Sequence, residues 1–288
     1  MRFALGTASF GMSYGINNCD GKVSRIMTEQ ILEYAASEKI SVLDTAMVYG
    51  DSEDRLGKIG VDSYKVISKL PPIPENLSNI QEWIFTQAKS SIERMKIKNL
   101  YALLLHSPEQ LLEPFGKEIY NTLQELKNRN FVKKIGISIY NPDDLNSLLS
   151  VGDFDLVQCP MNIIDQRLVS SGWLEKLKSR NIEVHVRSCF LQGLLLMKKE
   201  NMPEKFNTWD SIWNEWHTWL EQNNYSALHA CLSYCLSFKD LDCLIVGVEN
   251  TSQLEEIISV YKKTKINKFP NISSDDIRLI NPAKWDNL

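Results

Sequence analysis

The sequence of 288 residues predicts one α/β domain built as a closed (β/α)8 TIM barrel. Short apolar runs alternate with amphipathic segments, and eight such strand–helix units fill the chain. Most of the runs are almost continuously apolar, which is typical of parallel strands covered by helices. No domain boundary, internal repeat or low-complexity tract divides residues 1–288.

The predicted elements follow one another in a regular order. The strands are expected at 2–8, 41–46, 64–70, 100–106, 133–138, 154–160, 182–188 and 242–248. Between them apolar residues recur at helical spacing, as at Leu254, Ile257 and Ile258. Helices are expected at 27–38, 79–95, 115–129, 142–149, 171–179, 211–237 and 251–263, with a short charged helix at 52–58.

A doubly wound open sheet is the structural alternative to the barrel. Its dinucleotide-binding form requires G-x-G-x-x-G after the first strand. Here the glycines are Gly6, Gly11 and Gly15, a spacing that does not fit this motif. The barrel is therefore the favoured architecture.

The segment 189–210 has no regular pattern and follows the seventh predicted strand. It should lie over the C-terminal face of the barrel, where a long loop often serves as a lid or binding loop. Trp209, Trp213 and Trp216 then fall on one face of a helix, and burial against the barrel explains that spacing better than substrate contact.

Composition narrows the possible partners and location. Hydrophobic residues make up 43% of the chain and charged residues 24%, with a net charge of −4 spread over both signs. This balance argues against nucleic acid or a membrane as the main partner. The apolar runs are too short to span a bilayer, and the start has no secretory pattern, so a cytoplasmic location is expected. Oligomeric state cannot be inferred.

Six cysteines are present, and none forms a C-x-x-C pair. No ligand-spaced partners accompany them, so reduced thiols and no metal site are expected.

Four polar residues mark a candidate active site. Asp44, Lys69 and His106 end the second, third and fourth strands, and Tyr49 follows Asp44 in the next loop. In a barrel such strand ends face the active-site mouth, and adjacent strands lie about 4.8 Å apart. Asp44 can therefore pair with Lys69, whose ammonium group should lower the pKa of the Tyr49 phenol from about 10. His106 could hydrogen-bond a carbonyl oxygen while the phenol exchanges a proton with it.

Structural roles compete with this interpretation. Asp44 could cap a turn, Lys69 could belong to a structural ion pair, and His106 could bond only to backbone. Each alternative alone is as plausible as function. The four residues in this order and at these strand ends favour function.

The same residues resemble the aldo-keto reductase family. Its markers are D-T-A-x-x-Y-G at 44–50, Lys69 within VISKL and His106 within LLLH, and the resemblance extends to LIVGVENTSQLEE. It implies a (β/α)8 barrel and a catalytic tetrad, in which Tyr49 is the acid/base, Asp44 and Lys69 tune it, and His106 orients the substrate. It also implies a nicotinamide dinucleotide bound without a Rossmann domain.

The resemblance assigns further residues to the cofactor. Ser138 and Gln158 match positions that hold the carboxamide, whereas Ile139 stands where asparagine is usual. Arg187 replaces an aromatic residue that stacks on the nicotinamide; a guanidinium can also stack, and its charge would disfavour the oxidised, cationic ring. Further contacts to the dinucleotide are expected from Gly6, Thr7, Asp44, Ser188, Leu191, Gln192 and Gly193.

Cofactor preference is left open between NADP(H) and NAD(H). Family members that select NADPH place basic residues after the eighth strand, but this chain has Gly247 and Gln253 there and adds Glu249. A carboxylate repels a 2′-phosphate and can accept a hydrogen bond from a ribose hydroxyl. Asn250, Gln253 and Glu256 could still contact the adenosine.

The resemblance therefore predicts an NAD(P)H-dependent oxidoreductase that reduces an aldehyde or ketone. Its substrate pocket is expected around Tyr14, Met47, Tyr49 and His106, with a polar loop at 14–18 that suits a sugar-type carbonyl. One alternative is a catalytically silent cofactor-binding or sensor protein on the same scaffold. Another is a lyase with Lys69 as a Schiff-base amine, which a protonated Lys69 disfavours.

Overall fold

A closed barrel of eight parallel strands forms the centre of the protein, as the sequence predicts. The computed structural model describes residues 2–16, 18, 21–263 and 266–288. Each strand pairs with its neighbours in sequence, and the first and last strands pair to close the barrel. The strands are β1 (Arg2–Gly6), β2 (Val42–Asp44), β3 (Lys65–Leu70), β4 (Leu100–Leu105), β5 (Val132–Ser138), β6 (Leu156–Pro160), β7 (Glu183–Arg187) and β8 (Cys243–Gly247).

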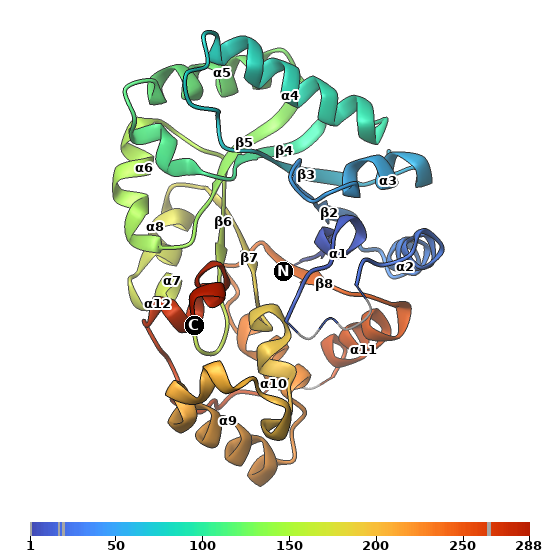
Figure 1. Cartoon of the computed structure of the whole chain (residues 1–288), viewed down its shortest axis with the longest axis vertical. Coiled ribbons are helices and arrows are strands. Elements are labelled where there is room, and N and C mark those ends of the chain that lie inside the picture. The colour runs from blue at the N-terminus through green and yellow to red at the C-terminus, as the bar shows by residue number, and fades with distance from the viewer. Residues whose placement is uncertain (1, 17, 19–20, 264–265) are drawn as a thin grey trace.

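Helices cover the outside of the barrel (Figure 1). The longer ones are α2 (Arg25–Ser37), α3 (Ser52–Ile59), α4 (Ile80–Met95), α5 (Gly116–Asn128), α6 (Leu145–Val151), α8 (Trp173–Ser179), α9 (Asp210–Asn223), α10 (Ala227–Leu236) and α11 (Thr251–Tyr261). Short turns of α-helix are α1 (Ala8–Gly11), α7 (Arg167–Ser170) and α12 (Ile277–Ile280). The 3₁₀ helices are η1 (Pro108–Leu112), η2 (Pro142–Asp144), η3 (Leu191–Leu196), η4 (Lys199–Asn201), η5 (Glu204–Trp209) and η6 (Pro282–Asn287).

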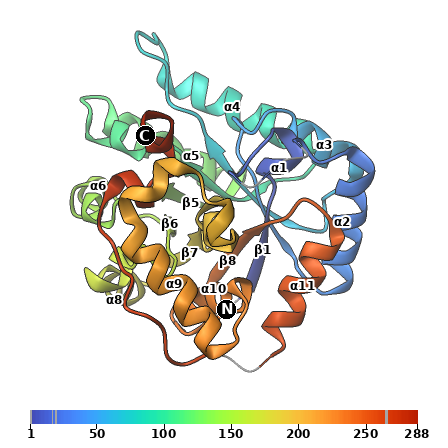
Figure 2. The same ribbon diagram turned by 60° about the horizontal axis from the view of Figure 1, so that its bottom comes forward.

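The single helix predicted over 211–237 is wrong, because the chain breaks it into α9 and α10. Asn224 takes a left-handed conformation with φ of 52° and caps α9, since its N–H donates to Glu221 O and Leu220 O. Ser226 then starts α10 by accepting a hydrogen bond from the N–H of His229. Figure 2 shows the two helices as separate rods.

Side chains fill the barrel interior. Ala4, Val42, Ile67, Leu104 and other small or branched residues form one buried cluster there. A much larger cluster lies between the strands and the surrounding helices. The barrel is therefore a packed core and not an open channel.

The segment 189–210 is less irregular than its sequence suggests, since η3, η4 and η5 fill most of it. Trp209, Trp213 and Trp216 are all buried, which confirms that this stripe packs into the core. The indole N–H of Trp213 donates to Phe206 O and that of Trp216 to Leu195 O, so the segment is fastened to α9. Its predicted role as a lid stays a prediction.

Within the described ranges, no helix combines the length and the apolar character needed to cross a membrane.

Candidate active site

The two-residue period of the strands places the predicted site at the top of the barrel interior. Val42, Ile67 and Leu104 point into the interior cluster. Two residues further along the same strands come Asp44, Lys69 and His106, so their side chains share that direction one layer higher. The same alternation carries Gln158 on β6 above the interior Leu156.

Asp44 and Lys69 form a buried ion pair. Lys69 Nζ lies 2.7 Å from Asp44 Oδ2 and also donates to Thr45 O at 2.9 Å. The other carboxylate oxygen, Oδ1, accepts a hydrogen bond of 2.6 Å from Gln158 Nε2. Lys69 is 1% exposed and Asp44 4%, so the pair is stable only because both charges are fully partnered.

Tyr49 is positioned by a close approach of two chain segments. A Cβ atom added at Gly11 would overlap the carbonyl oxygen of Tyr49, and one at Gly50 would overlap Gly11 O. Gly50 also has φ of +54°, a conformation that favours glycine. Beneath this contact, Ser52 Oγ donates to Thr7 and ties the turn after β2 to the end of β1.

The tyrosine, lysine and histidine lie together as predicted. Lys69 Nζ lies 5.2 Å from the centre of the Tyr49 ring. The rings of Tyr49 and His106 meet edge to face, with centroids 6.2 Å apart. The four predicted residues are therefore neighbours around one point at the barrel mouth.

The expected lowering of the phenol pKa is wrong for this structure. Burial raises the pKa of Tyr49 above its usual value of 10.0, and the Asp44 carboxylate adds to the rise. Lys69 cannot offset this, because its charge is matched by Asp44 at 2.7 Å. The cation that does lower the pKa of Tyr49 is Arg187, and its effect is smaller than that of burial.

His106 is neutral near pH 7. Burial lowers its pKa to about 4, and the charges of Lys69 and Arg187 act in the same direction. Its ring can therefore donate one N–H while the other nitrogen accepts. The site thus combines a protonated phenol with a neutral imidazole.

The pKa of Lys69 is lowered by burial, while Asp44 opposes the change. Its Nζ is enclosed by Asp44 and Thr45, and Lys69 does not line the adjoining cavity. A Schiff base needs an amine that a carbonyl can reach, so the lyase alternative loses support.

A cavity of about 500 Å³ opens beside this cluster. It has the size of a site for a small molecule or cofactor. The predicted residues that line it are Gly6, Thr7, Tyr14, Asp44, Tyr49, Arg187, Ser188, Gln192, Gly193, Gly247, Glu249, Gln253 and Glu256. The predicted residues outside its lining are Met47, Lys69, His106, Ser138, Gln158, Leu191 and Asn250. Asn17, in the predicted polar loop, lies outside the described residues.

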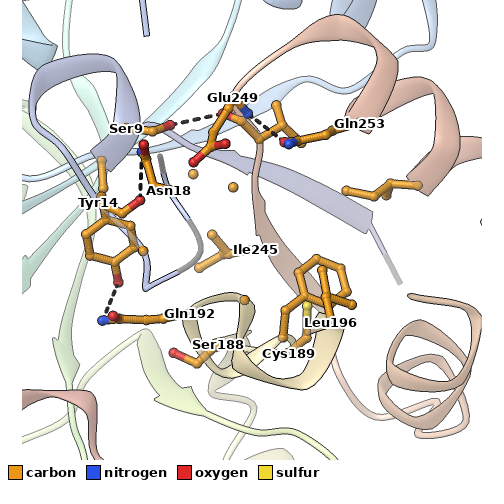
Figure 3. A pocket seen from close by; sticks show the side chains of 18 of the residues that line it. Ser9, Tyr14, Asn18, Ser188, Cys189, Gln192, Leu196, Ile245, Glu249 and Gln253 are labelled. Carbon is orange, nitrogen blue, oxygen red and sulfur yellow. Dashed lines mark hydrogen bonds between the residues drawn. The ribbon is translucent and has the colours of Figure 1, made fainter. Parts of the chain in front are cut away.

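Two loops meet across the cavity (Figure 3). The N–H of Ile16 donates to Gln192 O at 3.1 Å, and Gln192 Nε2 lies 3.4 Å from the Tyr14 hydroxyl. Ser188, Leu191 and Gln192 all have positive φ, which non-glycine residues adopt rarely and mainly where function or packing demands it. The predicted cofactor segment after β7 therefore has a special backbone shape.

Sequence reasoning missed part of the lining. Ser226, Ala227 and Leu228, at the start of α10, reach the cavity. The Asn-Tyr-Ser stretch at 224–226 signals a helix start, but its position over the barrel depends on tertiary packing. Phe190 and Leu196 also line the cavity, and they belong to the segment 189–210 that was expected over this face of the barrel.

The residues present suit the carboxamide of a nicotinamide ring. Gln158 is fully buried, and its Oε1 has no hydrogen-bond partner in the described part of the chain. A buried acceptor of this kind is costly unless a ligand donates to it, as a carboxamide NH₂ can. Ser138 ends the adjacent strand, where it pairs in register with Gln158.

At another part of the cavity wall, the loop from β8 to α11 carries acidic and amide groups. Glu249 N–H donates to Gln253 Oε1, and Asn250 Oδ1 caps α11 by accepting from Gln253 N–H. Asn250 is therefore engaged within its own turn. Among the lining residues, Glu249 and Glu256 contribute carboxylates here, and Arg187 is the cation of the lining.

The described cysteines are all buried; they are Cys159, Cys189, Cys231, Cys235 and Cys243. Across the described residues, no three His, Cys, Asp or Glu side chains gather in a way that could hold a metal ion.

Comparison with known proteins identifies the family to which the chain belongs. The model of the aldo/keto reductase family matches residues 2–274. D-arabinose 1-dehydrogenase of Saccharomyces cerevisiae is 24% identical over 280 residues, which cover 88% of this chain and 82% of that protein. An NADH-specific methylglyoxal reductase of Escherichia coli is 30% identical over 124 residues, which cover 42% of this chain and 36% of that protein.

Solved structures show the same fold. An aldo-keto reductase of Bacillus halodurans in its holo form matches with a TM-score of 0.73 and 17% identity, covering 92% of this chain and 88% of that one. The glycerol dehydrogenase of Gluconobacter oxydans matches with a TM-score of 0.70 and 20% identity, again covering 92% and 88%.

Proposed function

Because the chain belongs to the aldo/keto reductase family, we propose that it reduces an aldehyde or ketone to an alcohol with NAD(P)H, with Tyr49 as the proton donor. One observation carries this proposal. The Asp44–Lys69 ion pair, the Tyr49 phenol and the neutral His106 gather at the mouth of the barrel, beside a cavity of about 500 Å³.

The protonation states suit reduction. The raised pKa keeps the Tyr49 phenol protonated at neutral pH, so it can donate to a carbonyl oxygen. Neutral His106 can hydrogen-bond the same oxygen and fix its direction. When bound, the reduced nicotinamide supplies the hydride for the carbonyl carbon. The charge of Arg187, which lowers the pKa of the phenol, then stabilises the phenolate that Tyr49 leaves behind.

The dinucleotide would be held along the cavity wall. Outside the lining, Gln158 Oε1 and Ser138 would receive the carboxamide, and residues of the strained segment 188–193 within it would contact the pyrophosphate. Glu249, Gln253 and Glu256 would face the adenosine. Because no lysine or arginine among the described residues lines that part of the cavity, we propose that NADH is favoured over NADPH.

A sugar-type carbonyl compound is the proposed substrate class. The Tyr14 hydroxyl lies at the cavity wall, where it accepts from Gln192 Nε2 and keeps its own O–H to donate to a substrate. The likeness to a D-arabinose 1-dehydrogenase supports this choice.

The test separates an enzyme from a silent cofactor-binding protein. The purified chain is titrated with NADH and NADPH by tryptophan fluorescence, and then assayed for oxidation of bound reduced cofactor with aldehydes, ketones and aldoses. We expect both binding and turnover. Cofactor binding without turnover of any carbonyl would support the sensor alternative, and absence of binding would refute both.

A further inference from the structure

Arg187 is a cation at the active site with no carboxylate partner. It ends β7 and lines the same cavity as Tyr49, and its hydrogen bonds in the described part of the chain go to Ile139 and Ser188 and not to a carboxylate. Its Nη2 donates to Ile139 O at 3.0 Å, and its Nη1 lies 3.4 Å from Ser188 Oγ. The guanidinium carbon lies 4.4 Å from the centre of the Tyr140 ring.

These contacts leave much of the guanidinium unused. An arginine has five N–H donors, and two hydrogen bonds account for only part of them. A half-buried charge without a partner is unfavourable, and a ligand that supplies the missing acceptor regains that free energy. The N–H groups of Arg187 that have no acceptor are therefore available to bind a ligand.

The charge around Tyr49 is also unbalanced. The Asp44 carboxylate is fully engaged by Lys69 and Gln158, so that pair contributes no net charge. His106 is neutral near pH 7. Arg187 therefore leaves one positive charge in excess beside the reacting phenol.

Other carboxylates of the cavity do not balance this charge. Glu249 lies in the loop after β8 and Glu256 lies on α11, whereas Arg187 ends β7. Figure 3 shows Glu249 on the opposite side of the pocket from Ser188, the residue that follows Arg187. The excess positive charge of Arg187 therefore remains in the part of the cavity that contains Tyr49.

We propose that Arg187 binds an acidic group of the carbonyl substrate, so that the preferred substrates are anionic aldehydes or ketones, such as sugar acids or sugar phosphates. This inference rests on the proposed function. A planar guanidinium matches the geometry of a carboxylate or phosphate with two parallel hydrogen bonds. The Tyr14 hydroxyl, which lines the same cavity, can donate a further hydrogen bond to the acid.

This role is compatible with packing on the cofactor. The guanidinium carbon lies over the Tyr140 ring, and a nicotinamide ring would stack on a face of the same guanidinium. An acid would instead bind at the N–H edge. The two roles use different parts of the side chain, so experiment can separate them.

The test compares matched substrates that differ in one acidic group. D-glucuronate is paired with D-glucose for a carboxylate, D-glucose 6-phosphate with D-glucose for a phosphate, and 4-oxobutanoate with butanal for a shorter spacing. In at least one pair we expect kcat/KM to be about tenfold or more higher for the acid. Arg187→Gln should bring this ratio close to one, and Arg187→Lys should keep part of it.

Arg25→Gln is the matched control. Arg25 lies on the surface of α2, where it pairs with Glu29, so its loss removes the same charge outside the lining of the cavity. It should leave every substrate ratio unchanged. A ratio near one in the unaltered chain for all pairs, or a ratio that survives Arg187→Gln, contradicts the inference. Equal losses for both members of each pair would assign Arg187 to the cofactor and also overturn it.

A binding measurement keeps the inference testable if no carbonyl is reduced. Succinate and its neutral counterpart succinamide are titrated calorimetrically in the presence of NADH. Methyl phosphate is titrated in the same way. We expect one of the anions to bind, succinamide to bind at least tenfold more weakly, and Arg187→Gln to abolish the difference. No anion binding, or binding unaffected by Arg187→Gln, would refute the inference whatever the fate of the proposed function.

Discussion

At the scale of single residues, the protonation state of Tyr49 decides which half of the reaction the site favours. Burial and the Asp44 carboxylate raise the pKa of the phenol, and only Arg187 opposes them. A protonated phenol is the form that donates to a carbonyl oxygen. The resting site is therefore prepared for reduction, whereas alcohol oxidation must first remove this proton.

The pH dependence of carbonyl reduction follows from that raised pKa. Because the folded phenol stays protonated beyond its ordinary value of about 10, kcat/KM should show no alkaline decline from Tyr49 between pH 7 and pH 10. Steady-state rates with a carbonyl substrate that does not itself titrate will check this. A decline with an apparent pKa of 7 to 9 would mean that a cation lowers the phenol pKa after all.

The contributions of Asp44 and Lys69 to the free energy of unfolding should depend strongly on each other. Lys69→Met leaves the Asp44 carboxylate buried with Gln158 as its remaining side-chain partner, which should lower the free energy of unfolding by about 3–5 kcal/mol. The double variant with Asp44→Asn should regain much of this loss, because no buried charge then remains.

Chemical denaturation of both single variants and of the double variant gives the coupling energy. Additive losses would show that the two groups do not depend on each other.

At the scale of elements, the contact between α1 and the turn after β2 fixes the position of Tyr49. This contact exists because neither Gly11 nor Gly50 carries a side chain. The pattern of the sequence located Tyr49 in the right loop, yet α1 itself was not predicted. Four residues are too few to show helical periodicity, so only the folded structure reveals this support.

Gly11→Ala should therefore lower turnover, although Gly11 itself is not one of the four active-site residues. The new methyl group would overlap Tyr49 O and must displace α1 or the turn. Misplacement of a reacting group by about 1 Å can reduce turnover about 100-fold, and we expect a loss of that order. Turnover and thermal unfolding are the measurements.

Gly172→Ala provides the comparison. Gly172 has φ of +73° with open space around it, so the variant should lose about 1 kcal/mol from backbone strain and keep its turnover. Equal effects of the two variants on turnover would argue against a positioning role for Gly11.

The elements that the sequence predicted well are those set by local pattern. All eight strands were expected close to their observed bounds, because covered parallel strands are recognisable apolar runs. The strand ends that carry Asp44, Lys69 and His106 were located by the same pattern. The break at Asn224 was missed because apolar residues continue at helical spacing on both sides of it, which hides the helix cap in the sequence. The direction of the Tyr49 pKa shift was missed because the burial of a side chain depends on the complete fold.

At the scale of the whole molecule, one cavity joins the Tyr49 cluster to the loop between β8 and α11. Its charges are unevenly arranged. Arg187 supplies positive charge beside Tyr49, whereas Glu249 and Glu256 supply negative charge at the loop after β8. The proposed orientation of the dinucleotide places the adenosine at this acidic part.

Cofactor choice should respond to charge at that part of the cavity. The unaltered chain should bind NADH more tightly than NADPH, and Gln253→Arg should improve NADPH binding about tenfold by pairing with the 2′-phosphate. Gln222→Arg, on the exposed surface of α9, adds the same charge elsewhere and should change neither affinity. Fluorescence titration of the three proteins with both cofactors decides the point. Tighter binding of NADPH by the unaltered chain would contradict it.

The central claim is that the Tyr49 phenol gives its proton to a bound carbonyl oxygen, and Tyr49→Phe tests it most directly. The variant removes one oxygen atom and keeps the ring that packs against His106 and Lys69. Turnover should fall by at least about 100-fold, the range expected for loss of a general acid, while NADH binds with nearly unchanged affinity. Turnover close to that of the unaltered chain would contradict the account.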